Sequence, residues 1–267
     1  MESTLSSEIA TSVLRQLHAQ ASREDAGAKE RVRLREAKLG RRLDPAERYE
    51  LYGDAPLAIT REVGHLYYLM AGSSRVRSVV EFGASHGIST IYLAAALRDT
   101  GGGGIISTEI LPRKAKMARH NLSAVDLGDL VELRVGDALQ TLQQLTQEVD
   151  LLVLDGRNDQ YVAVLELLRP NLAHNALVVA DLGKDDPDLL RYQQHVRDPG
   201  RGVFFDRTTS RRRHRTVEEA RIADLRSTID SPPHPTWAAA DAALTPSNTS
   251  RRPYREPNDD RTGAGRR

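Results

Sequence analysis

Ser78-Val-Val-Glu-Phe-Gly-Ala-Ser-His-Gly-Ile-Ser-Thr90 carries the clearest structural signal in the chain. It opens with a short apolar run, which is typical of a strand buried on both faces. Gly83 and Gly87 then allow a tight turn, because glycine adopts backbone conformations that other residues rarely reach. Apolar side chains at helical spacing follow from Ser89 to Leu97. The segment therefore predicts a strand, a glycine turn and a helix, in that order.

The same alternation continues to about residue 206. Further strands are predicted at 104–108, 130–135, 149–154, 175–180 and 202–205, with helices between them. Because apolar strands that alternate with helices form a parallel sheet covered on both faces, we expect an α/β fold with a doubly wound, mostly parallel sheet. In such sheets a ligand binds beyond the carboxyl ends of the strands.

Composition divides the chain into three parts. Residues 1–75 are polar and rich in helix formers, so we expect N-terminal helices there, one of them capped by Thr60. Residues 76–206 carry most of the apolar runs and form the predicted α/β domain. Residues 207–267 contain 13 arginines, 8 acidic residues and 6 of the 12 prolines. We expect this basic tail to be largely disordered, because it has few large apolar residues, apart from a short helix at 216–226.

The overall composition excludes several classes of protein. The 267 residues include no cysteine, which excludes disulfides, thiol catalysis and cysteine-ligated metal clusters. Lys and Arg total 38 against 37 for Asp and Glu, so the chain as a whole is not a polyanion binder. Its apolar runs are shorter than the about 18 residues of a membrane span, and it begins without a signal-peptide pattern. We therefore expect a cytoplasmic protein with no membrane contact.

Polar or glycine-containing elements follow five of the predicted strands. They are Gly83-Ala-Ser-His-Gly87, Glu109, Gly136-Asp137-Ala138, Asp155-Gly156 and Asp181. The glycine turn opens a helix whose free N–H groups favour an anion such as a carboxylate, and Ser85 and Ser89 add hydroxyl donors. Glu109 can accept both hydroxyl protons of a ribose, and Asp137 a proton from an adenine amine. Each element alone also fits an ordinary turn, a surface acid or a helix N-cap, but together they favour a nucleoside cofactor with a free carboxylate.

As an ordered set, these motifs resemble the class I S-adenosylmethionine-dependent O-methyltransferases, and most of all the bacterial catechol and caffeoyl-CoA type. The matching stretches are Glu81-Phe-Gly-Ala-Ser-His-Gly-Ile-Ser-Thr90, Ser107-Thr-Glu109, Gly136-Asp-Ala138, Leu154-Asp-Gly156 and Val178-Val-Ala-Asp181, within about 54–205. The resemblance implies a Rossmann-like methyltransferase fold with S-adenosyl-L-methionine as cofactor. It also implies O-methylation of a hydroxyl on a small phenol- or catechol-like acceptor.

The resemblance assigns roles to individual residues. The implied cofactor site contains Glu81, Gly83, Ser85, Gly87, Ser89, Glu109, Asp137, Ala138 and Asp155. The glycine turn would hold the methionine part, Glu109 the ribose, and Asp137 would lie near the adenine. Ala55-Pro-Leu-Ala-Ile-Thr60, called here the closing segment, resembles the segment that closes over the cofactor.

A phenol or alcohol acceptor must also lose its proton to a base or near a metal ion. We expect Asp155 to serve as the base or as a metal ligand, with Asp181 as the second candidate. His86 is a further candidate base, although contact with the cofactor or simple exposure would account for it better.

Departures from the family pattern affect the metal site and the end of the sheet. Metal-dependent members resemble Asp-x-x-Lys after the fourth strand and Asp-Asn after the fifth, whereas this chain has Asn158 and Leu182 at the lysine and asparagine positions. Asp155 and Asp181 remain as ligands for one Mg²⁺ with water, so a magnesium site stays open. The family also ends in a paired antiparallel strand, and we find no alternating apolar segment after Phe205 to supply it.

Other interpretations stay open on the sequence. A degenerate homologue that binds cofactor without turnover is consistent with the lost lysine and asparagine. An NAD-dependent oxidoreductase has the same sheet, but Ser85 and Ile88 replace two glycines of its G-x-G-x-x-G motif. The Arg-rich tail permits salt-sensitive phosphate contacts, yet a solvated tail is the simpler explanation, so we expect no nucleic-acid partner. The charged N-terminal helices are consistent with a homodimer.

Overall fold

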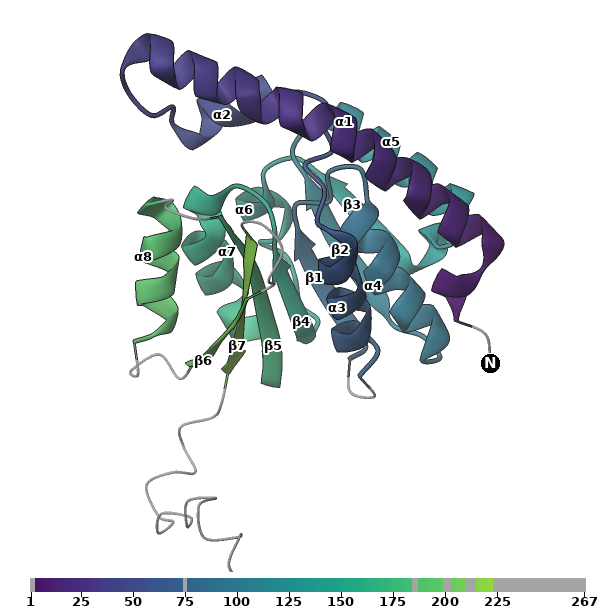
Figure 1. Ribbon diagram of the computed structural model, residues 1–267. Helices are drawn as coiled ribbons and strands as arrows, with labels where there is room; N and C mark the ends of the chain where they lie inside the picture. Colours follow the sequence, from purple (N-terminus) through teal and green to yellow (C-terminus); the bar gives the residue numbers. More distant parts are fainter. Residues whose placement is uncertain (1–2, 74–75, 184–186, 199–202, 210–214, 223–267) are drawn as a thin grey trace, which may run out of the picture. The chain divides into compact units, whose positions relative to one another are not determined.

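The fold is an α/β sheet with helices on both faces (Figure 1). The computed structural model describes residues 3–73, 76–183, 187–198, 203–209 and 215–222. The helices are α1 (Glu8–Leu39), α2 (Pro45–Tyr52), α3 (Arg61–Ala71), α4 (Ile88–Asp99), α5 (Pro112–Ala124), α6 (Ala138–Thr141), α7 (Tyr161–Leu168) and α8 (Pro187–Val196). The strands are β1 (Ser78–Phe82), β2 (Gly104–Glu109), β3 (Val131–Val135), β4 (Val149–Leu154), β5 (Leu172–Gly183), β6 (Val203–Thr209) and β7 (Arg215–Ile222).

Within the described residues the strands pair in the order β3-β2-β1-β4-β5-β7-β6. The first five strands along the chain are parallel, which confirms the predicted doubly wound sheet. β1 lies in the middle, and its register places Phe82 beside Thr108 of β2 and beside Leu154 of β4. The residues that follow these three positions therefore leave the sheet at one edge, next to one another.

The two faces of the sheet pack into two apolar layers, because successive side chains of a strand point to opposite sides. Val79, Ile105 and Leu151 pack on one face with α1, α3 and α4. Val80, Ile106 and Leu152 pack on the other face with α6, α7 and α8. Strands covered on both sides explain why these segments are apolar along their whole length.

Of the N-terminal helices, α1 packs against α2, and α3 packs against α4. Ser7 is the N-cap of α1, and its hydroxyl accepts the N–H of Ala10, while Gly40 follows the last residue of the helix in a left-handed conformation. α1 also contacts α5 (Figure 1). α3 begins at Thr60, whose side chain accepts the N–H of Val63, which confirms the predicted N-cap.

β7 contradicts the expectation that no strand follows Phe205. It pairs antiparallel with β5, where Val217 lies opposite Asp181, and with β6, where Ala220 lies opposite Phe205. Four charged residues in Arg215–Ile222 interrupt any alternation, so the sequence pattern does not predict a strand there. Pairing on both sides supplies what the local pattern lacks.

The same pairing corrects further expectations. The predicted start of the tail at residue 207 falls inside β6, and the described part of the helix expected at 216–226 is strand. β5 runs to Gly183 because β7 pairs with it that far, so Asp181 lies within the strand rather than after it. The tail from residue 223 lies outside the described residues. Among the described helices, none combines the length and apolar character that a membrane crossing requires.

Candidate functional site

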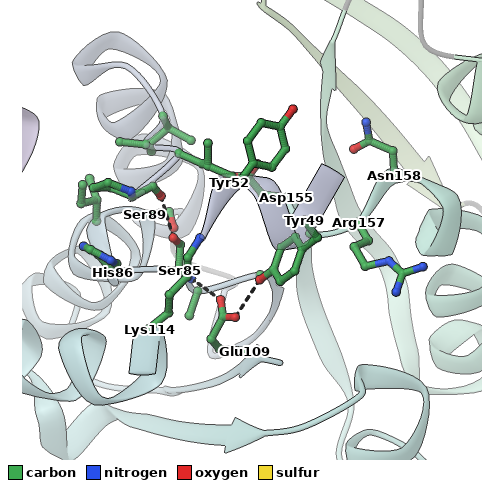
Figure 2. A pocket seen from close by; sticks show the side chains of 18 of the residues that line it. Tyr49, Tyr52, Ser85, His86, Ser89, Glu109, Lys114, Asp155, Arg157 and Asn158 are labelled. Carbon is green, nitrogen blue, oxygen red and sulfur yellow. Dashed lines mark hydrogen bonds between the residues drawn. The ribbon is translucent and has the colours of Figure 1, made fainter. Parts of the chain in front are cut away.

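A cavity of about 830 Å³, which includes space open to solvent, lies where β1, β2 and β4 end. Six structural parts line it: the glycine turn after β1, the end of β2, the loop after β4, one face of α2, the closing segment and Lys114 of α5. Figure 2 shows the polar residues among them. They include Arg48, Tyr49, Tyr52, Ser85, His86, Ser89, Glu109, Lys114, Asp155, Arg157 and Asn158.

The glycine turn has the tight geometry that the sequence predicts. Gly83 has φ +103°, and a Cβ there would lie 2.6 Å from the carbonyl oxygen of Asp155. Gly87 has φ +80° and precedes α4 without a side-chain cap, so the first N–H groups of α4 are left for another acceptor. Ser85, at φ +47°, also lies in the left-handed region. This turn lets a ligand approach the backbone closely, and the uncapped start of α4 offers it N–H donors.

Glu109 sits at the centre of a hydrogen-bond group beside this turn. Its Oε2 accepts the backbone N–H of Ser85 at 2.9 Å, and its Oε1 accepts the N–H of Leu111 at 2.8 Å. The hydroxyl of Tyr49, from α2, donates to the same Oε1 at 2.7 Å (Figure 2). Burial, and then the neighbouring Glu109 carboxylate, raise the pKa of the Tyr49 phenol, so it keeps its proton.

Lys114 brings a buried cation to the same group. Its side chain is 1% exposed, and its Nζ lies 5.4 Å from the centre of the Tyr49 ring. Burial lowers the pKa of Lys114, while the nearby carboxylates of Glu109, Asp25 and Asp54 act in the opposite direction. Tyr49 is thus held by its hydroxyl on Glu109 and by its ring on Lys114.

The closing segment lines the cavity, and two contacts hold it there. The Ser85 hydroxyl donates to the carbonyl oxygen of Pro56 at 2.6 Å. Asp25 of α1, itself buried, accepts the N–H groups of Leu57 at 2.8 Å and of Ala58 at 2.9 Å. The glycine turn, the closing segment and α1 therefore form one connected wall.

Asp155 and His86, the two candidate bases, both line the cavity. Asp155 leaves β4 with its N–H bonded to the carbonyl oxygen of Phe82 at 2.9 Å. His86 is buried at 4% exposure, which contradicts the alternative that it is simply exposed. Burial, and then the charge of Lys114, lower the pKa of His86, so its imidazole is neutral near pH 7 and able to accept a proton.

A second cavity, of about 310 Å³, also borders Tyr49, Gly83 and Glu109. Gly136 and Ala138 from the loop after β3 line it. The carboxylate of Asp137 instead caps α6, accepting the N–H of Leu139 at 2.9 Å, which is the alternative role that its position suggested.

Glu81 and Asp181 do not line either cavity. Glu81 is fully buried, accepts the hydroxyls of Thr90 at 2.6 Å and Ser107 at 2.5 Å, and has its pKa raised by burial. It therefore ties β1 to β2 and α4. The register of β4 and β5 pairs Leu154 with Ala180, the residues just before Asp155 and Asp181, but Asp181 is 7% exposed within its strand.

The residues present fit a magnesium ion poorly. Within the described part of the chain, no group of three or more His, Cys, Asp or Glu side chains is arranged to hold a metal. The lysine and asparagine positions of the metal-dependent pattern hold Asn158 and buried Leu182. We therefore derive no step through a metal ion.

Several residues of the cavity wall were not predicted from sequence. Pro45, Arg48, Tyr49 and Tyr52 share one face of α2, and Lys114 enters from α5. Asp44 and Glu47 form a capping box, which is a readable signal for the start of α2. The sequence offers no signal for the contact between Tyr49 and Glu109, 60 positions apart.

Comparison with known proteins shows which proteins this chain is similar to. A family model described as a methyltransferase domain matches residues 80–181. A catechol O-methyltransferase of Mycobacterium tuberculosis is 34% identical over 126 residues, which are 47% of this chain and 56% of that protein. A catechol O-methyltransferase of Niastella koreensis is 29% identical over 137 residues, 48% of this chain and 59% of that protein. The chain thus spans little more than half the length of these two relatives.

Solved structures show the same fold. Cofactor-bound Rv0187 from M. tuberculosis superposes with a TM-score of 0.55 at 29% identity, covering 62% of this chain and 82% of that one. TomG from Streptomyces achromogenes, solved with S-adenosylmethionine, has a TM-score of 0.55 at 23% identity, covering 63% and 82%, and its likeness concerns the fold alone. The predicted resemblance to class I S-adenosylmethionine-dependent O-methyltransferases is confirmed.

Proposed function

We propose that this protein is an S-adenosylmethionine-dependent methyltransferase that acts on a hydroxyl group of a small molecule. The observation that carries the proposal is the position of Glu109, whose carboxylate lies in the cavity and is bonded to the N–H of Ser85 in the glycine turn. A carboxylate for sugar hydroxyls and the start of α4, which has no side-chain cap, thus border one space. This is the pairing that a nucleoside with an amino-acid tail requires.

Different residues of the cavity wall would hold different parts of the cofactor. Glu109 would accept ribose hydroxyl protons, while the turn from Gly83 to Gly87 and the hydroxyl of Ser89 would hold the methionine part. The second cavity, lined by Gly136 and Ala138, would take the adenine. The bound cofactor supplies a sulfonium methyl group, which is already a strong electrophile, so the protein mainly contributes alignment and exclusion of water.

The acceptor hydroxyl must lose its proton during transfer. Asp155 and neutral His86 are the candidate bases on the cavity wall. Pro56, Leu57, Ala58 and Tyr52 supply apolar surface that favours a flat, phenol-like acceptor over a highly charged one. The relatives named catechol O-methyltransferases support the same acceptor class.

Calorimetric titration of the full chain with S-adenosylhomocysteine tests the proposal. We expect binding to wild type, and about tenfold or greater weakening in Glu109→Gln, which keeps the side-chain size but removes the charge. Glu132→Gln, on the neighbouring strand and outside both cavities, is the matched control and should bind like wild type. If NADH binds and S-adenosylhomocysteine does not, the chain belongs with the oxidoreductases.

Methyl transfer from labelled S-adenosylmethionine to a panel of phenols and catechols tests turnover. Product formation supports the enzyme, whereas binding without any product across the panel supports the degenerate homologue. Running the assay with a chelator tests the magnesium prediction. Full activity after chelation would show the Asp155–Asp181 metal site to be wrong.

A further inference from the structure

We propose that Tyr49 is a displaceable latch: its hydroxyl occupies the ribose position on Glu109, and the cofactor enters only when α2 withdraws it. This inference rests on the proposed function and adds a gate to the same site. Tyr49 borders both cavities, and so contacts the spaces that we assign to the methionine part and to the adenine.

The hydrogen-bond capacity of Glu109 is the first argument. A carboxylate offers about four acceptor positions, two on each oxygen. Oε1 already accepts the Tyr49 hydroxyl and the N–H of Leu111, and Oε2 accepts the N–H of Ser85. One position is left, whereas the two neighbouring hydroxyls of a ribose need two. Because the two N–H donors belong to the backbone next to Glu109, only the Tyr49 hydroxyl can leave without unfolding the turn.

The construction of α2 is the second argument, because it allows the helix to move as a unit. Its capping box joins Asp44 and Glu47 by two reciprocal bonds, which keep the first turn intact. Gly40 and Gly53 flank the segment with φ +62° and +55°, conformations in which glycine is unstrained. None of the residues of α2 is fully buried, although Tyr49, Leu51 and Tyr52 are half-buried, so withdrawing the helix leaves both apolar layers of the sheet intact.

The contacts that hold the latch closed are local. Besides the bond to Glu109, Tyr49 has its ring near the Lys114 ammonium. Arg31 of α1 donates to the carbonyl oxygens of Leu51 at 3.2 Å and Tyr52 at 3.5 Å, at an exposed position. Arg48 of α2 also forms an ion pair with Glu36 of α1 at 3.7 Å, so polar contacts to α1 and to Glu109 hold the closed state. A ligand whose own hydroxyls donate to Glu109 replaces the hydrogen bond from the Tyr49 hydroxyl with one of the same type.

Tyr49→Phe tests the latch, because it removes the competing hydroxyl and keeps the ring. If an open state must form before binding, the apparent dissociation constant equals the intrinsic one divided by the open fraction. We expect Tyr49→Phe to bind S-adenosylhomocysteine about tenfold more tightly in calorimetry, with the gain in the association rate measured by stopped flow. Tyr68→Phe is the matched control: its hydroxyl also donates to a carboxylate, that of Asp99 at 2.6 Å, but outside both cavities.

Hydrogen exchange provides a readout that needs no ligand. Amides of residues 45–52 should exchange faster in Tyr49→Phe than in wild type or Tyr68→Phe. Equal or weaker binding by Tyr49→Phe, with wild type still binding, would overturn the latch and leave the proposed function standing. Absence of binding in every variant would overturn the proposed function and the latch with it.

Discussion

Replacing Gly83 by alanine tests whether the glycine turn requires a residue without a Cβ at this position. The added Cβ would lie 2.6 Å from the carbonyl oxygen of Asp155 and 2.7 Å from the Cα of Gly156, at φ +103°. The left-handed backbone costs a residue with a Cβ about 1–2 kcal/mol, and forcing an atom into packed backbone costs about 1–3 kcal/mol more. We therefore expect Gly83→Ala to lower the free energy of unfolding by about 2–5 kcal/mol.

Gly101→Ala is the matched control for this substitution. Gly101 has φ +89°, but a Cβ there meets no atom within 4 Å. It should cost only the backbone term, about 1–2 kcal/mol, and leave binding of S-adenosylhomocysteine unchanged. Urea unfolding followed by circular dichroism measures both variants, and the difference between them isolates the clash. If Gly83→Ala is no less stable than Gly101→Ala, the close approach of the β1 turn to the β4 loop does not constrain the site.

The remaining predictions concern α1 and pH. Asp25→Ala frees the N–H groups of Leu57 and Ala58, so we expect affinity for S-adenosylhomocysteine to fall about tenfold or more, and unchanged calorimetric affinity would contradict the role of the closing segment. Burial and Arg61 lower the pKa of His18 from 6.5 to about 4, so the unfolded chain binds the proton more tightly and stability should fall as pH drops from 6.5 to 4. After discounting for solvent at this half-buried ring, the loss is roughly 1–2 kcal/mol in urea unfolding, and His18→Gln should remove that part of the pH dependence. An identical pH profile in His18→Gln would refute this assignment.

The parallel part of the fold is readable from sequence because its strands are buried on both faces. Segments such as 149–154 and 187–196 match the observed elements residue for residue, since the apolar run and its flanking residues define them locally. β7 and the full length of β5 are not readable in this way. Their pairing depends on each other, and a charged strand between two neighbours carries no local periodicity.

The candidate site also contains some residues that could be predicted from sequence and others that could not. Gly83 and Glu109 meet because the strands before them are in register, with Phe82 beside Thr108, so the ends of a parallel sheet suffice to predict their proximity. Tyr49 and Lys114 reach the cavity from helices whose rotation and docking depend on packing across many residues. Glu81 is predicted to belong to the cofactor site because it lies beside the turn, but its buried carboxylate instead joins β1 to β2 and α4.

The placement of β7 between β5 and β6 has a consequence for synthesis of the chain. β6 leaves the ribosome first, yet its described neighbour in the sheet is made of later residues, 215–222. Until that segment emerges, β5 presents an open edge, and such edges recruit strands from other nascent chains. If translation ends before residue 215, β7 is never made and the edge of β5 stays open. Chains truncated there should therefore form inclusion bodies rather than a smaller working protein.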